Sequence, residues 1–381
     1  MGRGRRPVAR FWAGVVSGRL ILEDGSVFHG EALVEGSRFA EIVFNTSMTG
    51  YQEILTDPSY RGQIVIMTQP HIGNYGAYDG AEESHRVWVE GFVAREFTGR
   101  RSGLGDVDLG AYLETNGVPT LAGIDTRAAV RRLREFGAMR GMITSCDRPD
   151  EELIEQVRQQ PTMEGRALVD EVTCESPYDI EPEGGEKVRL AVYDFGVKQN
   201  ILRSLVRHGA RVTVLPARTP ATECLALGVD GVVLSNGPGD PEPLHEIVRE
   251  VRELVEARVP TFGICLGHQL LGLALGGKTF KLKFGHRGGN QPVRDEETGQ
   301  VSITSQNHGF ALSADSLPED CKVAAVNLND GTVEAFKAVG RPIFSVQYHP
   351  EAAPGPHDAA RLFGEFLDVC VQEAGPRNEA L

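Results

Sequence analysis

The chain has 381 residues, of which 41% are hydrophobic and 24% are charged, and its formal net charge at pH 7 is −14. This length and composition are typical of a globular protein with about two domains. The negative charge argues against nucleic-acid binding, because phosphate backbones require a basic surface. The sequence has no apolar run of about 18 residues, so we expect no transmembrane helix and take the cytoplasm as the expected location.

The first half of the chain predicts a domain of mixed α and β structure over residues 18–174. Residues 1–17 precede it as an arginine-rich tail. The apolar patch of this tail is too short for a signal peptide, so we expect the tail to be disordered. Within the domain, Asp24-Gly25 lies between two alternating apolar runs, which predicts a β-hairpin.

Two helices are expected later in this domain. Residues 126–136 have apolar side chains at helical spacing. Residues 147–161 have the same character, and Asp147 or Asp150 is expected to cap the first turn. Residues 175–186 are rich in proline, glycine and acidic residues, and we interpret them as a linker.

The second half has a different sequence pattern, in which continuous apolar strands alternate with amphipathic helices over residues 187–375. A short tail follows at 376–381. This pattern predicts an open, mostly parallel sheet with helices on both faces. In chain order we expect strand 187–196, helix 198–209, strand 210–217, strand 228–237, helix 243–258, strand 259–264 and helix 266–277. Ligands bind such sheets outside the carboxyl ends of the strands, and Cys265 lies at one of these ends.

Cys265 stands between Gly263 and Gly267 in "TFGICLGH". A G-x-C-x-G segment between a strand and a helix is the thiol version of a nucleophile elbow. Glycine allows neighbouring backbone to approach where a Cβ atom would clash. The six cysteines include no C-x-x-C pair, so the sequence predicts neither a zinc site nor a disulfide framework.

A nucleophilic thiol requires a base. A free cysteine has a pKa of about 8.5, and lowering it to about 7 requires roughly 2 kcal/mol. A helix N-terminus supplies only about 0.3–1 kcal/mol. We therefore expect a histidine partner, and His349 in "VQYHPEA" is the best candidate, because Pro350 favours an extended backbone. Glu351 then shares a face with His349 and can orient it as the third member of a triad. His268 is expected to point along its helix.

The oxyanion of the intermediate also requires donors. The backbone N–H of Leu266, directly after the nucleophile, is the first expected donor, and the loop "SNGPGDP" with Gly237 and Gly239 is the natural source of a second. Each motif alone has a simpler structural interpretation, since a lone cysteine is usually a buried hydrophobic residue. His286 and His308 are expected to be structural or to lie around the substrate. The coincidence of the motifs at three strand ends is the specific signal.

At this point the motifs allow a comparison with known families. "GICLGHQLL", "SNGPGDP" and "HPEAAPGPHDA" resemble those of the class I, triad-type glutamine amidotransferases. "FNTSMTGYQEILTDPSY" at 44–60, "PHIGNYG" at 70–76 and "SQNHGFAL" at 305–312 resemble the small chains of carbamoyl-phosphate synthase. The resemblance extends from about Leu20 to nearly the end of the chain, and the motifs of the first half are specific to this member of the class.

The resemblance implies that glutamine binds over Cys265, which attacks the side-chain amide to give a γ-glutamyl thioester. His349 would protonate the departing ammonia and then activate water, with Glu351 orienting it. The positions that match the family's glutamine-binding residues are Ser47, Gly237, Gly239, Leu266, Gln269, Asn307, Gly309 and Phe310. Ser47 would reach the substrate from the first domain.

The resemblance also implies a partner. Ammonia would pass through an internal tunnel to a separate large chain, which would use ATP, Mg²⁺ and bicarbonate to make carbamoyl phosphate for arginine and pyrimidine synthesis. This chain contains no Walker-type phosphate loop, so we expect no cofactor and no metal in it. Arg287 and Gln291 depart from the family, which often has histidines there.

Two alternatives remain at this stage. A stand-alone cysteine hydrolase of the same fold would have no use for the first domain. A catalytically inactive glutamine-sensing or scaffold subunit would normally have lost a triad residue, whereas Cys265, His349 and Glu351 are all present.

Overall fold

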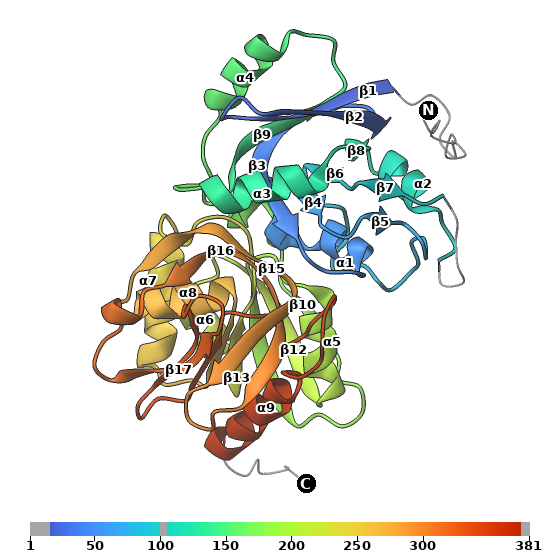
Figure 1. Ribbon diagram of the computed structural model, residues 1–381. Coiled ribbons are helices and arrows are strands. Elements are labelled where there is room, and N and C mark those ends of the chain that lie inside the picture. Colours follow the sequence, from blue (N-terminus) through green and yellow to red (C-terminus); the bar gives the residue numbers. More distant parts are fainter. Residues whose placement is uncertain (1–15, 100–104, 375–381) are drawn as a thin grey trace. The chain divides into compact units, whose positions relative to one another are not determined.

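The computed structural model describes residues 16–99 and 105–374 (Figure 1). Residues 1–15 of the predicted N-terminal tail and the whole predicted tail 376–381 lie outside the described residues. The chain forms two compact units that are not continuous in sequence. The first comprises the residues up to Gln52, Gln63–Ala81 and Val89–Pro161, and the second comprises Glu53–Gly62, Glu82–Trp88 and the residues from Thr162 onward. The linear domain boundaries stay a prediction.

The first unit contains a closed barrel with the strand order β1-β2-β8-β6-β4-β3-β9, and β5 pairs with β7 in a separate two-stranded sheet. Its strands are β1 (Val16–Leu22), β2 (Val27–Val34), β3 (Ser37–Asn45), β4 (Gln63–Met67), β5 (His71–Ile72), β6 (Gly91–Val93), β7 (Glu96–Phe97), β8 (Thr120–Ala122) and β9 (Met139–Thr144). Its helices are α2 (Leu109–Thr115), α3 (Thr126–Phe136) and α4 (Asp150–Arg158), and the short helix α1 (Tyr51–Thr56) carries residues of both units.

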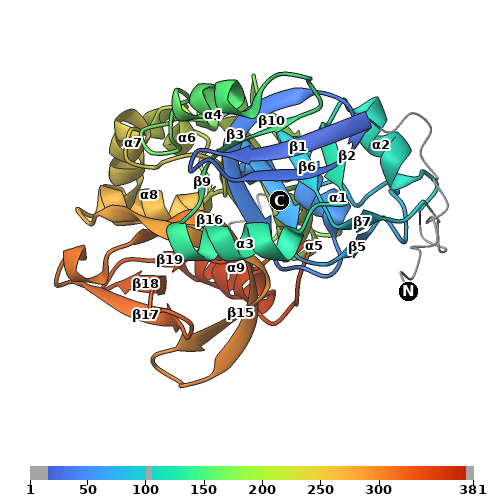
Figure 2. The same ribbon diagram turned by 45° about the horizontal axis from the view of Figure 1, so that its top comes forward.

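The barrel confirms the mixed α and β character expected of the first half. Strands β1 and β2 form the predicted antiparallel hairpin, with Ile21 opposite Val27 on either side of the Asp24-Gly25 turn. Helix α3 begins after Asp125, whose side chain accepts a hydrogen bond from the N–H of Ala128. It packs against β3 and β4, and Figure 2 shows it together with the barrel strands from a second side.

The predicted cap of α4 is wrong. Pro149 occupies the N-cap position without a side-chain hydrogen bond, and Asp150 is already the first helical residue. The acidic residues Asp150, Glu151 and Glu152 instead all lie in the first turn. Negative charge there is stabilised by the positive end of the helix dipole, so the acidic run favours the helix start without capping it.

The second unit is built on a ten-stranded sheet with the order β10-β12-β11-β13-β14-β19-β18-β17-β15-β16. Its strands are β10 (Tyr178–Ile180), β11 (Val188–Asp194), β12 (Ala210–Pro216), β13 (Gly231–Leu234), β14 (Thr261–Ile264), β15 (Thr279–Asp295), β16 (Val301–Leu312), β17 (Cys321–Asn327), β18 (Val333–Ala338) and β19 (Ile343–Val346). Its helices are α5 (Gln199–Arg207), α6 (Ala221–Ala226), α7 (His245–Glu256), α8 (Leu266–Ala274) and α9 (Arg361–Ala374), with 3-10 turns at Pro58–Tyr60, Val169–Glu171 and Ala314–Ser316.

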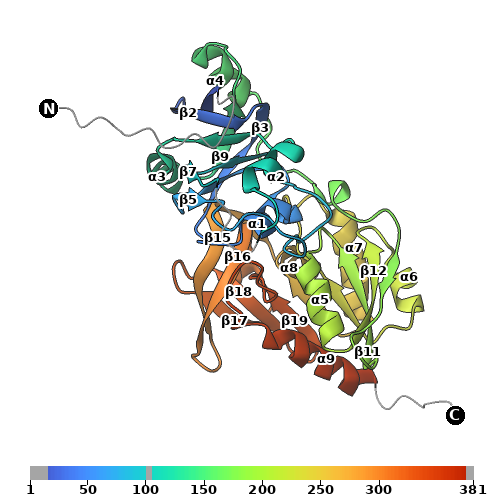
Figure 3. The same cartoon turned by 90° about the vertical axis from the view of Figure 1, so that its right-hand side faces the viewer.

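The five strands from β12 to β19 along this order run parallel, and the sheet continues on both sides through antiparallel strands. In Figure 3 the orange-red strands β15 to β18 lie toward one end of the sheet and β11 and β12 lie toward the other. The predicted parallel α/β fold is therefore confirmed for its central strands. Part of the segment interpreted as a linker forms β10, which pairs with β12.

Helices cover both faces of this sheet. One apolar cluster joins the sheet to α6, α7 and α8, and a second joins it to α5 and α9. The strands are buried on both sides because both clusters pack on them, which is why their sequences are continuous apolar runs. The carboxyl ends of the parallel strands remain as the edge where loops can place functional side chains.

Candidate active site

Cys265 occupies the sharp turn between β14 and α8. It is the N-cap residue of α8. Its backbone has φ +54° and ψ −101°, a conformation that residues other than glycine rarely adopt. A Cβ atom at Gly263 would lie 2.7 Å from the carbonyl oxygen of Gly267, and one at Gly267 would lie 2.1 Å from the carbonyl oxygen of Leu234. Both glycines are therefore required by close backbone approach, as the elbow interpretation predicts.

The thiol of Cys265 is buried among polar groups. The side chain is 2% exposed. Its Sγ atom lies 3.7 Å from the carbonyl oxygen of Asn307, and the Nε2 atom of Gln347 lies 3.7 Å from Sγ. The thiol is therefore shielded from solvent and contacts both β16 and the segment that follows β19.

His349 and Glu351 form the expected pair, and both side chains are buried. The Nδ1 atom of His349 donates to Oε1 of Glu351 over 2.6 Å, and the Nε2 atom has no hydrogen-bond partner within the described residues. The backbone N–H of His349 donates to Ser305 O of β16, which fixes the position of the histidine. Because the Nδ1 bond to a carboxylate leaves Nε2 as the free ring nitrogen, this is the nitrogen that can exchange a proton with a nucleophile.

Lys198 adds a cation to this pair. Its Nζ atom donates to Oε1 of Glu351 over 2.9 Å and to the carbonyl oxygen of Ala352 over 2.6 Å. Both side chains of the Lys198–Glu351 ion pair are almost fully buried. The Glu351 carboxylate is therefore held between the Lys198 ammonium and the His349 imidazole.

The charges around His349 set its protonation. Burial by itself lowers the pKa of His349, but the carboxylate of Glu351 and the thiol of Cys265 beside the ring raise it to about 10. Burial raises the pKa of Glu351, yet Lys198 and His349 lower it to about 2. Burial lowers the pKa of Lys198, and Glu351 and Glu83 raise it above its usual range. The site thus favours an imidazolium beside the Glu351 carboxylate, which suits an acid that protonates a leaving amine.

Among the predicted glutamine-binding residues, Leu266 follows Cys265 directly and Asn307 contacts its thiol. A Cβ atom at Gly237 would lie 2.8 Å from Cδ2 of Leu266, so the glycine loop lies against the first residue of α8. Gly239 has φ +90°. The Nε2 atom of Gln269 donates to the carbonyl oxygen of Phe310 over 2.8 Å and to Oε1 of Gln347 over 3.0 Å.

Asn307, Gly309 and Phe310 belong to β16, which passes the thiol. The Nδ2 atom of Asn307 donates to Oδ2 of Asp57 over 2.9 Å. A Cβ atom at Gly309 would lie 3.3 Å from Nη2 of Arg287. Phe310 packs with Met163 and Leu168 in a small apolar cluster. These contacts place the residues but do not test their predicted role in binding glutamine.

Ser47 belongs to the other compact unit. It is buried, and its backbone N–H donates to Oδ1 of Asn45 over 2.7 Å. Its Oγ atom has no hydrogen-bond partner among the described residues. Its reach to glutamine therefore stays a prediction.

The sequence interpretation missed Lys198 and Gln347. Lys198 follows the carboxyl end of β11, and the rule that functional side chains gather at such ends could have identified it. Gln347 follows β19 directly and lies two residues before His349, a spacing that places side chains on one face where the backbone is extended. Asp57, from the first half of the chain, had no signal beyond its place in the "LTDPSY" motif.

The other histidines of this region have structural surroundings. The Nδ1 atom of His268 contacts Oγ of Ser345, and burial lowers the pKa of His268 to about 3. His268 is therefore a neutral, packed residue, in agreement with the expectation that it does not serve the thiol. Of the two departures from the family, Arg287 is buried and donates to the carbonyl oxygen of Phe284 over 2.8 Å, and Gln291 accepts from Asn329 over 2.9 Å.

The parallel sheet, the thiol at the elbow and the His349–Glu351 pair together define a class I glutamine amidotransferase domain. The family described as glutamine amidotransferase class-I matches residues 191–369. The family described as carbamoyl-phosphate synthase small chain, CPSase domain, matches residues 20–143. None of the helices in the described part of the chain combines the length and apolarity needed to cross a membrane.

Relatives that match nearly the whole chain identify its family within this class. The chain is 51% identical over 364 residues to the carbamoyl phosphate synthase small chain of Syntrophotalea carbinolica, covering 92% of this chain and 96% of that one. It is 50% identical over 363 residues to the protein of the same name from Aquifex aeolicus, covering 92% and 98%. For the protein of that name from Escherichia coli (strain K12), the identity is 47% over 375 residues, covering 94% and 98%. The chain belongs to the family of carbamoyl-phosphate synthase small chains.

Proposed function

We propose that this chain hydrolyses L-glutamine at Cys265 and delivers the ammonia to a separate large subunit of a glutamine-dependent carbamoyl-phosphate synthase. The observation that carries the proposal is the buried arrangement at the carboxyl edge of the parallel sheet. There, a strained elbow holds a thiol beside a histidine whose other ring nitrogen is bonded to a carboxylate. Cysteine–histidine–carboxylate arrangements of this kind perform acyl transfer.

The reaction proceeds in two halves. The Cys265 thiolate attacks the side-chain amide carbon of glutamine, and the oxyanion of the tetrahedral intermediate accepts hydrogen bonds from the N–H of Leu266 and from the loop of Gly237 and Gly239. His349, an imidazolium, gives its Nε2 proton to the amine as the C–N bond breaks, releasing ammonia and leaving a γ-glutamyl thioester. The now neutral His349 takes a proton from water, which attacks the thioester. Glutamate leaves, the thiolate returns, and His349 is again protonated.

Glutamine is held by the residues around the thiol. In this proposal Gln269 and the backbone of Gly309 and Phe310 position the substrate, Asn307 contacts its polar end, and Ser47 is a further binding residue by its match to the family motif. Lys198 keeps Glu351 ionised, so Glu351 in turn keeps Nε2 of His349 directed at the reacting atoms. Asn307 and Cys265 are already neighbours, because Sγ lies 3.7 Å from the Asn307 carbonyl oxygen.

The partner supplies the remaining chemistry. The family to which the chain belongs is defined by a small chain, which implies a large one. The large chain would bind ATP and Mg²⁺, activate bicarbonate and combine it with ammonia to give carbamoyl phosphate, which feeds arginine and pyrimidine synthesis in the cytoplasm. The glutaminase half-reaction needs no cofactor in this chain, because thiol, imidazole and backbone donors account for every bond made and broken.

The test is glutamine hydrolysis by this chain, alone and with its large chain, beside Cys265→Ser. We expect hydrolysis to rise when the large chain, ATP and bicarbonate are added, because closure of such sites is commonly gated by the partner. Cys265→Ser should abolish hydrolysis, while added ammonia still supports carbamoyl phosphate synthesis by the complex.

The alternative of a catalytically inactive regulatory or scaffold subunit makes the opposite prediction. A folded wild-type chain that hydrolyses no glutamine, alone or with its large chain, would establish that alternative. Loss of ammonia-dependent synthesis in Cys265→Ser would instead show that the substitution disturbs the complex, and Cys265→Ala would then be compared with it.

A further inference from the structure

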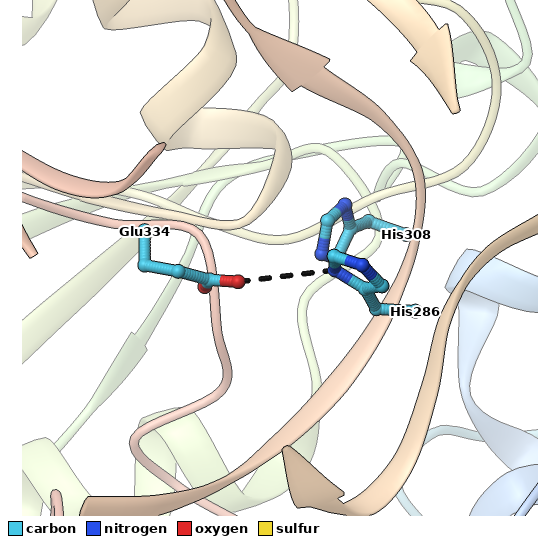
Figure 4. Close-up of side chains that lie close together, drawn as sticks. All are labelled: His286, His308 and Glu334. Atoms are coloured by element: carbon cyan, nitrogen blue, oxygen red, sulfur yellow. Dashed lines mark ion pairs between the residues drawn. The ribbon is translucent and has the colours of Figure 1, made fainter. Parts of the chain in front are cut away.

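Three buried titratable side chains meet outside the predicted catalytic residues, one from each of three strands. They are His286 of β15, His308 of β16 and Glu334 of β18 (Figure 4). His286 and His308 are directly opposite each other in the antiparallel β15–β16 pair, and their rings lie 5.0 Å apart edge to face. Nitrogen atoms of the two rings and a carboxylate oxygen of Glu334 all lie within 4.8 Å of one another.

Each imidazole is held by an acceptor on its far side. The Nε2 atom of His286 lies 2.8 Å from the carboxylate of Asp330, and the Nδ1 atom of His308 lies 2.8 Å from the carbonyl oxygen of Phe310. Since these oxygen atoms only accept, each of these nitrogens carries a hydrogen. The lone pairs of a neutral His286 Nδ1 and a neutral His308 Nε2 are therefore directed into the cluster. Carboxylates and carbonyls in this outer position are the usual orienting partners of metal-binding histidines.

Inside the cluster, hydrogen-bond acceptors face one another without a donor between them. His286 Nδ1 has no hydrogen-bond partner among the described residues and lies 3.8 Å from Oε1 of Glu334. The Nε2 atom of His308 lies 3.0 Å from Oε1 of Gln306. The amide of Gln306 cannot turn to donate there, because its Nε2 atom already donates to Glu334 over 2.8 Å. Two imidazole lone pairs, a carboxylate and an amide oxygen thus converge.

A positive charge must satisfy this set, as either protons or a metal ion. Protonating both rings would bury two imidazolium ions side by side, with their ring centroids 5.0 Å apart. The Oε1 atom of Glu334 accepts from Nδ2 of Asn327 over 2.9 Å and from Nε2 of Gln306 over 2.8 Å, whereas its Oε2 atom has no hydrogen-bond partner among the described residues. A divalent cation would balance the carboxylates of Glu334 and Asp330 while leaving both histidines neutral.

We propose that His286, His308 and Glu334 form a binding site for a divalent transition-metal ion of the zinc class. Imidazole nitrogens favour such ions over Mg²⁺ or Ca²⁺, which prefer oxygen ligands. Two histidines and one carboxylate are an established ligand set for zinc, with a fourth position left for water or another oxygen. Oε1 of Gln306 is placed to fill that position. The sequence predicted no metal in this chain, because the three ligands come from distant strands and form no short motif.

The site has a structural consequence for the neighbouring thiol. Gln306 and His308 flank Asn307, whose carbonyl oxygen lies 3.7 Å from Sγ of Cys265. A metal ion bridging β15, β16 and β18 would therefore fix the strand segment that passes the thiol. The proposal does not depend on the glutaminase reaction, because metal binding is measured directly.

The experiment uses the full chain carrying Cys265→Ser, so that the catalytic thiol cannot bind the metal, after treatment with a chelator. Co²⁺ is titrated into the protein and followed by its visible absorption, and Zn²⁺ is titrated by calorimetry. We expect one ion per chain, bound with the absorption of a nitrogen and oxygen ligand set and without a thiolate band. Glu334→Gln and His286→Gln should each weaken binding by about 100-fold or more, because loss of even an outer orienting partner typically costs about 10–100-fold.

His245→Gln, which removes an exposed histidine at the start of α7, is the matched control and should bind like the parent. The proposal is overturned if the folded parent binds neither ion, which would mean that protons alone fill the cluster. It is equally overturned if Glu334→Gln and His286→Gln bind as the parent does. Should these variants fail to fold, X-ray absorption of the zinc-loaded parent decides the matter, because a first shell without imidazole nitrogen contradicts the site.

Discussion

At the scale of single residues, the most unusual feature is a lysine buried beside the predicted triad. Lys198 donates to Glu351 and to the carbonyl oxygen of Ala352, and the ion pair is almost fully shielded from water. Buried ion pairs do not necessarily stabilise a fold, because each charge loses its hydration. Removing one partner is different, since the other charge then remains buried without compensation.

Lys198→Met is therefore expected to lower the free energy of unfolding by about 3–5 kcal/mol. The methionine fills a similar volume but leaves Glu351 with His349 as its nearest counter-charge. Urea unfolding of the variant and the wild type measures the difference. Lys337→Met is the control, because the Lys337–Glu297 pair is exposed and worth only about 0–1 kcal/mol. Equal stability of the two variants would contradict the importance assigned to Lys198.

His349 makes stability depend on pH in a defined direction. Its folded pKa of about 10 lies above its ordinary value of 6.5. The folded state thus binds the proton more tightly, and this stabilisation is complete below pH 6.5 and is lost as the pH rises through 10. We expect the stability difference between the wild type and His349→Gln to shrink steadily over this interval. Urea unfolding of both proteins at successive pH values tests this, and a difference that grows with pH would refute it.

At the scale of secondary-structure elements, local sequence patterns predicted the turns, helices and strands that depend on neighbouring residues. The elbow at Cys265, the β1–β2 hairpin, the helices α3 and α5 and the parallel strands all follow from glycine placement and apolar periodicity. The pairing of β1 with β9, which closes the barrel, was not predicted, because strand pairing between distant segments leaves no local pattern. Lys198 and Gln347 differ from the barrel, because each has a positional signal in the sequence: the carboxyl end of β11 for Lys198 and the two-residue spacing from His349 for Gln347.

The elbow also permits a test in which two effects oppose each other. Alanine at Gly267 would gain about 1 kcal/mol of helix propensity. Its Cβ atom, however, would lie 2.1 Å from the carbonyl oxygen of Leu234, so backbone must move. We expect the clash to dominate, with a net destabilisation of about 1–3 kcal/mol in thermal or urea unfolding and a loss of glutaminase activity as the thiol shifts. Gly185→Ala is the matched control, since nothing lies near a Cβ atom there, and a Gly267→Ala protein as stable as this control would contradict the argument.

At the scale of the whole molecule, the second compact unit is completed by segments from the first half of the chain. Glu53–Gly62 and Glu82–Trp88 both belong to it. Ser59 accepts a hydrogen bond from Nδ2 of Asn236, and the N–H of Asn200 donates to Glu83. The pattern of the second half alone could not reveal this, because its strands and helices already form a complete α/β rhythm.

A substitution of Asp57 tests whether these segments of the first half support the site. One of its carboxylate oxygens accepts from the N–H of Ser59 over 2.9 Å, and the other accepts from Nδ2 of Asn307 over 2.9 Å. Asp57→Ala would leave both buried donors without this acceptor, and a buried donor without a partner costs about 1–3 kcal/mol. We therefore expect lower stability in urea unfolding and, because Asn307 lies against the thiol, a several-fold higher KM for glutamine.

Asp170→Ala provides the comparison, because it removes a carboxylate of the same unit whose partner, Arg218, is half exposed. Its effect on stability should stay within about 1 kcal/mol, and its KM should be unchanged. If Asp57→Ala matched Asp170→Ala in both stability and KM, the segment Glu53–Gly62 would lie beside the site without supporting it. If stability fell while KM stayed constant, the hydrogen bond to Asn307 would support the fold without positioning glutamine. A change in both follows only if this aspartate, far from Cys265 in the sequence, helps to hold the strand that passes the thiol.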